Sequence, residues 1–138
     1  KAQAQAIGAL GRMALHGFME ECTAALREVA LHSGVERSRI AAVEALGETA
    51  VSILRRDVAP IVARRRRALV SEESEPAAQI VGKLEEVAAF DDVEAVRRCA
   101  ALALERIAAE ARSVDRSDLA DACLSFLANL AAEEEGTL

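Results

Sequence analysis

The sequence predicts an all-α domain, and two observations support this fold class. The first is composition: hydrophobic residues make up 52% of the 138 residues, aromatic residues only 2%, and there are two Pro and seven Gly. Ala, Leu, Glu and Arg, which favour helices, are abundant. The second is internal similarity, because DDVEAVRRCAALALERIA at 91–108 resembles SGVERSRIAAVEALGETA at 33–50. We therefore expect a single helical domain over residues 1–138.

Three helices are predicted in the first part of the chain, and they cover about residues 2–16, 18–31 and 35–55. In each, apolar residues recur at spacings of three and four, which places them on one helical face. Gly17 and the HSG sequence at 32–34 separate the helices. Ser33 and Glu36 have the spacing of a capping box, in which the hydroxyl accepts a hydrogen bond from the third helical amide.

Four more helices are predicted, and they cover about residues 57–70, 75–89, 93–112 and 118–134. Asp57 and Ser74 are suitable caps for the first two of them, each with a proline tolerated in the first turn. Asp91 and Glu94 repeat the capping-box spacing before the next helix, and Asp115 is a plausible cap for the last. The total is about seven helices.

The internal similarity holds along the chain when the sequence is shifted by a constant number of residues, so that position 33 aligns with position 91. This shift is called the repeat displacement. It also aligns Leu46 with Leu104 and Asp57 with Asp115. A helical hairpin cannot bury its apolar face alone, whereas stacked similar hairpins share one continuous core. We expect halves 18–72 and 76–134 to be related units, with residues 18–72 superposing on 76–130. Leu46 and Leu104 should then be buried at equivalent places.

The segment PAAQIVGKLEEVAAFDDVEAVRRCAALALERIA at 76–108 resembles a HEAT repeat. The matching residues are Pro76, Asp91, Asp92, Val96, Arg97, Ala100, Ala101, Ala103 and Leu104, and in the earlier copy Arg39, Ala42, Ala45, Leu46 and Gly47. The fourth and seventh predicted helices are similar to third helices of armadillo-like units. The resemblance implies an α–α superhelix, a short HEAT/armadillo-like solenoid, that presents a surface to a protein and less often to nucleic acid.

No catalytic or cofactor motif is recognisable, so neither an enzyme nor a cofactor is expected. The sequence lacks the spacing of a phosphate loop, a zinc knuckle, an HExxH helix or a nucleophile elbow. His16 and His32 each have a glutamate four residues away, Glu20 and Glu28, and we interpret these as helix-surface pairs instead of metal ligands. The net charge of −6 argues against a general nucleic-acid binder.

Cysteines and neighbouring carboxylates are interpreted as structural features. Cys22, Cys99 and Cys123 lack metal-ligand spacing and lie in apolar helical contexts, so we expect small buried thiols in a reducing, cytoplasmic compartment. The carboxylate pairs at 20–21, 85–86 and 91–92 point in different directions on a helix and are expected to be solvated or to cap helices.

The one local candidate for binding is the arginine run at 64–67. Arg64 and Arg67 share a helical face and form a candidate basic site for an acidic protein, a phosphate or an anionic membrane. The alternative is that these arginines only favour the C-terminal half of their helix through its dipole.

The leading functional hypothesis is a non-catalytic protein-interaction or regulatory scaffold that binds a protein partner. One alternative is a cytosolic domain of a membrane protein, with the arginine run near the lipid surface. Another is an accessory domain of an enzyme. Stacking with a second copy stays open, and the uncapped helical start KAQAQAIGAL suggests part of a longer chain.

Overall fold

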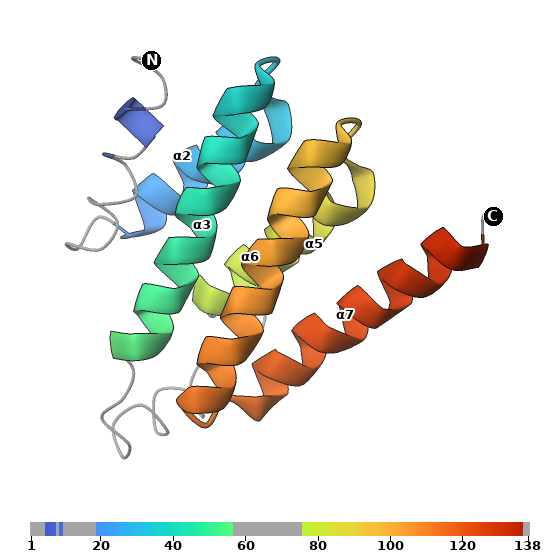
Figure 1. Ribbon diagram of the computed structural model, residues 1–138. Helices are drawn as coiled ribbons and strands as arrows, with labels where there is room; N and C mark the ends of the chain where they lie inside the picture. Colours follow the sequence, from blue (N-terminus) through green and yellow to red (C-terminus); the bar gives the residue numbers. More distant parts are fainter. Residues whose placement is uncertain (1–4, 8, 10–18, 57–75, 137–138) are drawn as a thin grey trace.

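The computed structural model describes residues 5–7, 9, 19–56 and 76–136, and every regular element in these ranges is a helix (Figure 1). The helices are α2 (Met19–His32), α3 (Glu36–Arg56), α5 (Pro76–Phe90), α6 (Glu94–Ser113) and α7 (Ser117–Gly136). All five agree with the predicted helices, with ends displaced by one or two residues. The predicted helix at 57–70 and most of the one at 2–16 lie outside the described residues.

Two helical hairpins lie side by side. Figure 1 shows α3 beside α6, with α2 and α5 behind them. The most extensive contact joins α3 to α6, whereas α2 and α5 touch at few places. Helix α7 packs against α6 near the start of α7 and then diverges, so its contact with α5 is slight.

The core lies between these helices and consists mainly of aliphatic side chains. Leu46 and Leu104 are both completely buried, which confirms the burial predicted for the pair. Gly47 allows α3 and α6 to approach closely, because a Cβ atom placed there would lie 3.1 Å from the Cβ of Ala103. Small residues at the crossing therefore set the spacing of the two hairpins.

The capping-box prediction was wrong in its geometry. Helices α3 and α6 begin at Glu36 and Glu94, so these glutamates occupy the first helical position instead of the third. Ser33 and Asp91 each accept a hydrogen bond from the amide two residues later. The bonds are Val35 N to Ser33 Oγ, 3.2 Å, and Val93 N to Asp91 Oδ1, 2.9 Å. The side chains stabilise the turns that precede the helices.

Asp115 also differs from its prediction as a cap. It lies in the turn between α6 and α7 with φ at 61°, in the left-handed region. Helix α7 begins at Ser117, so Asp115 is two residues before it, and an N-cap residue normally has extended backbone. Asparagine and aspartate tolerate this left-handed conformation better than most residues, which explains an aspartate here.

Candidate functional site

The basic site predicted at Arg64 and Arg67 lies outside the described residues and stays a prediction. His16 is outside them too. On α2, His32 Nε2 lies 3.9 Å from Glu28 Oε2, with both side chains largely exposed. The described part of the chain contains no group of three or more side chains suited to hold a metal ion. It also contains no helix long and apolar enough to span a membrane.

An ionic cluster with a buried pair, Arg39 and Asp91, at its centre connects the two hairpins, and the sequence did not predict it. Arg39 Nε lies 3.0 Å from Asp91 Oδ2, and Arg39 Nη2 lies 3.2 Å from Asp92 Oδ1. Arg39 Nη1 also donates to the carbonyl of Ser33 at 2.8 Å. The side chains of Arg39 and Asp91 are only 10% and 7% exposed. The expectation of a solvated or merely capping carboxylate was therefore wrong for Asp91, because packing of α3 on α6 brings Arg39 to it.

Two adjoining hollows lie between α5 and α7 and are together called the groove here. Its wide end has a volume of about 550 Å³ and is lined by Gly82, Glu85, Glu86, Ala89, Phe90, Phe126, Asn129, Leu130 and Glu133. Its narrow end has a volume of about 190 Å³ and is lined by Ala78, Val81, Gly82, Glu85, Arg116, Asp118, Leu119 and Ala122. Gly82 and Glu85 line both ends, so they mark the middle of the groove.

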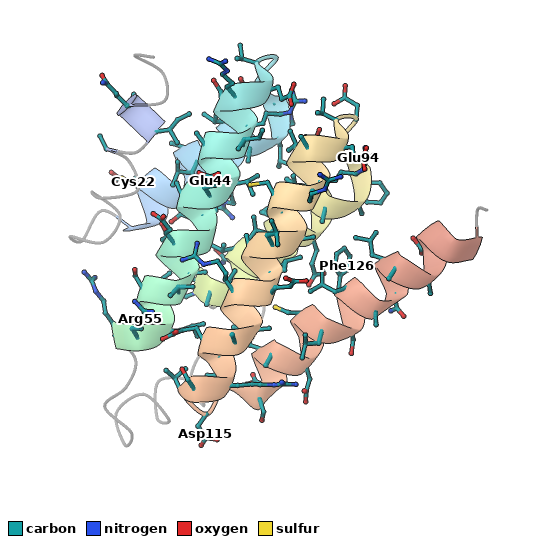
Figure 2. All side chains as sticks on the ribbon, in the orientation of Figure 1. Cys22, Glu44, Arg55, Glu94, Asp115 and Phe126 are labelled. Atoms are coloured by element: carbon teal, nitrogen blue, oxygen red, sulfur yellow. The ribbon has the colours of Figure 1, made fainter. Side chains whose placement is uncertain are left out.

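The walls of the groove provide apolar contact surface. Phe90, at the end of α5, is 82% exposed, and Phe126 is half-buried on α7, where Figure 2 labels it. A Cβ atom added at Gly82 would meet nothing within 4 Å. Such a glycine costs helix stability and leaves space in the groove. The two rings lie on opposite walls of the groove, so both α5 and α7 contribute apolar surface to it.

Glu85 places a carboxylate at the centre of this groove. It is half-buried, and burial raises the pKa of its carboxyl above the ordinary value. Among the residues that the structure describes, no cationic group or hydrogen-bond donor pairs with it. Its neighbour Glu86 instead has Lys83 Nζ 3.4 Å from its Oε2. A partly desolvated carboxylate without a cation is a favourable place for a basic group of a binding partner.

An ion pair lines the narrow end of the groove. Arg116 Nε donates to Asp118 Oδ1 at 3.1 Å, and the Arg116 side chain is only 4% exposed. Burial acts to raise the pKa of Asp118, but its hydrogen bonds and the charge of Arg116 together hold that pKa below the ordinary value. This end is therefore fixed at neutral pH by an ionised carboxylate.

The cysteines are partly as expected. Cys22 and Cys123 are buried, but Cys99 is only half-buried, with its Sγ 3.9 Å from Glu44 Oε1. Burial, together with the charge of Glu44, raises the pKa of Cys99. For Cys123, burial is the larger cause and the charge of Glu85 the next, and they raise the pKa to about 11. The Cys123 thiol thus lies near the carboxylate of Glu85 and stays protonated.

Comparisons with models of protein families, with curated proteins and with solved structures give no match to this chain.

Proposed function

We propose that this chain is a short HEAT-like helical-repeat domain whose role is to bind a protein partner without catalysis. The repeat is supported by the turns before α3 and α6, which share three backbone hydrogen bonds related by the repeat displacement. The bonds are Ser33 N to Val29 O, Ser38 N to Val35 O and Arg39 N to Val35 O, with counterparts Asp91 N to Val87 O, Val96 N to Val93 O and Arg97 N to Val93 O. Each is 3.1 Å long.

The observation that carries the binding function is the groove between α5 and α7. Both walls are helices whose backbone groups already hydrogen-bond within each helix, so an extended peptide could not add a β-strand to them. A helix satisfies its own backbone and presents only side chains, and the space at Gly82 lets a helix approach closely. We therefore propose an amphipathic helix as the bound element.

Charge complementarity defines the composition of that helix. The groove offers Phe90 and Phe126 to apolar side chains, while Glu85 offers a carboxylate that has no cationic partner among the described residues. A helix with apolar residues at spacings of three and four, and one Lys or Arg among them, matches both features. Pairing Glu85 with this cation would offset part of the cost of its partial burial.

Peptide display on the purified chain tests this function. A random library would be selected on the original chain, and the recovered peptides assayed on Gly82→Leu, which fills the middle of the groove in open space. Ala109→Leu adds the same side chain at an exposed site of α6 and is the matched control. We expect the peptides to bind the control normally and Gly82→Leu about tenfold or more weakly, a loss of about 1.4 kcal/mol.

Two results would contradict the proposal. One is a library that yields no binding peptides. The other is a set of peptides that bind Gly82→Leu as tightly as the original chain, which would place the binding surface elsewhere. Glu85→Gln separates the charge from the shape: weaker binding only of peptides that contain Lys or Arg would support the proposed cation.

A further inference from the structure

We propose that Arg97 is a docking point for the carboxylate of an acidic turn on a partner protein. The proposal rests on a different observation from the groove: within this chain, Arg39 already makes such a contact with Asp91 and Asp92. Arg39 and Arg97 align at the repeat displacement and lie at the same place in their helices. The internal contact therefore serves as a template for the external one.

The two arginines are held in the same way. Arg39 Nη1 donates to the carbonyl of Ser33, six residues before it, and Arg97 Nη1 donates to the carbonyl of Asp91, again six residues before it. Both turns continue into a helix that begins three residues after the carbonyl that is bound. The same nitrogen therefore anchors each side chain to the equivalent carbonyl.

They differ in what their other nitrogens bind. Arg39 uses Nε and Nη2 for the carboxylates of Asp91 and Asp92. Within the described ranges, Nε and Nη2 of Arg97 have no acceptor, although the side chain is half-buried and anchored. A planar guanidinium already held in place loses little further freedom when it binds a carboxylate through two hydrogen bonds.

By analogy with Arg39, we expect the free side of Arg97 to face away from the first hairpin. Arg39 reaches from α3 to the turn between α5 and α6, so the equivalent direction from α6 leads beyond the second hairpin. Figure 1 shows that α7 diverges from α6 on this side. Phe90, which borders the wide end of the groove, directly precedes the turn whose carbonyl binds Arg97. A partner seated on the groove would thus have Arg97 near its edge.

The template also indicates which partner fits. A second copy stacked in the same direction would present Ser33 and Gly34 where the internal contact has Asp91 and Asp92. Neither residue carries a carboxylate, so self-stacking would leave Arg97 unpaired. The partner is therefore a different protein, with aspartate in a turn that begins a helix.

A peptide titration tests the proposal. The probe is AFDDVEAV, blocked at both ends, which copies residues 89–96 and so the acidic turn that Arg39 binds. Nuclear magnetic resonance of the ¹⁵N-labelled chain would follow the side-chain Nε–H of Arg97. We expect a saturable shift at millimolar peptide that weakens at high salt. Changing both aspartates of the probe to asparagine should weaken binding about tenfold or more, since hydrogen bonds to charged groups are stronger than neutral ones.

Protein variants provide the controls. Arg97→Lys keeps the charge without the fork of donors and should also bind about tenfold or more weakly, since charged hydrogen bonds are lost. Arg98→Gln is the matched control, because Arg98 is largely exposed and pairs with Glu94, and its binding should not change. Circular dichroism verifies that each variant folds, and Arg97→Met serves if the lysine variant does not.

Three outcomes would overturn the proposal. They are equal binding of the aspartate and asparagine probes, an equal shift of Arg97 by acetate alone, and no saturable shift at all. Sedimentation of the original chain adds a fourth: self-association abolished by Arg97→Lys would make the occupant a second copy instead of another protein.

Discussion

Glu85, the carboxylate proposed to bind a partner, affects the stability of the folded chain. Burial raises the pKa of its carboxyl, so the folded chain favours the protonated form. The stabilising contribution is therefore present at pH values below the unfolded pKa, and it is lost as the pH rises through the folded pKa. At neutral pH, ionised Glu85 lowers the free energy of unfolding. Residues that serve binding often reduce stability in this way.

We expect Glu85→Gln to raise the melting temperature at pH 7, with the difference disappearing near pH 4. The amide keeps the shape of the side chain and removes the charge. The matched control is Glu86→Gln, which loses the pair with Lys83 and should not stabilise the chain. Thermal unfolding followed by circular dichroism at both pH values measures the effect. A gain of equal size at pH 4 would show that ionisation is not its cause.

Cys123 makes a separate prediction at alkaline pH. Its folded pKa of about 11 exceeds the value of about 8.5 for a free thiol, so its contribution to stability is present at lower pH and is lost as the pH rises across that interval. The chain has no Tyr, and Lys1 and Lys83 are its only lysines, so apart from the thiols of Cys22 and Cys99 few side chains titrate in this range. We expect Cys123→Ala to lose less stability than the original chain between pH 8.5 and 11. Parallel denaturation curves for both proteins would contradict this.

At the scale of helices, two glycines in similar positions have opposite surroundings. Gly82 lies in the exposed groove with open space around it, whereas Gly47 lies where α3 meets α6. We expect Gly82→Ala to stabilise the fold by about 0.5–1 kcal/mol, because alanine favours a helix. In Gly47→Ala the same gain is opposed by the 3.1 Å approach to Ala103, a methyl group that cannot rotate away.

Urea denaturation of the two variants measures this difference. The prediction is a higher midpoint for Gly82→Ala than for Gly47→Ala, with unchanged slopes. If Gly47→Ala were the more stable variant, α3 and α6 would have room to separate, and their close contact would not limit the packing.

Helix positions were predictable from sequence because periodicity and breakers are local. The geometry of the turns was less predictable from sequence. Ser33 and Asp91 each have a glutamate at capping-box spacing, but the helices begin two positions later than that motif requires. The groove could not be predicted, because Glu85 and Phe126 lie far apart in sequence and meet only through the path of α7. The Arg39 cluster could not be predicted either, because Asp91 lies 52 residues from Arg39 and meets it only when α3 packs on α6.

At the scale of the whole molecule, Arg39 and Asp91 join the two hairpins. Removing one partner of a buried pair leaves the other charge without compensation, which costs about 3–5 kcal/mol. We expect Arg39→Met to destabilise the chain by an amount of this order, because Asp91 then stays buried without a cation. Asp91→Asn should cost less, because Asp92 still pairs with Arg39. The double variant should be less destabilised than the sum of the single ones, because the interaction can be lost only once.

Equilibrium denaturation of the four proteins gives the coupling energy between these residues. Arg55 and Glu110 provide a control cycle, because their 2.9 Å pair also joins α3 to α6 but the Arg55 side chain is 67% exposed. Its coupling should be about 1 kcal/mol or less. Equal coupling in the two cycles would mean that burial of Arg39 and Asp91 adds nothing.

Because α7 packs against essentially one neighbour, we expect it to open locally more often than α6 does. Helix α7 is held in place mainly by packing on α6, whereas α6 packs on α3 and α5 as well as on α7. Local opening requires less free energy where fewer apolar contacts must break. In hydrogen–deuterium exchange, α7 should therefore exchange before α6, and a ligand in the groove should slow it. The last helix would then report occupancy of the groove as a change in exchange rate, without any change in its mean position.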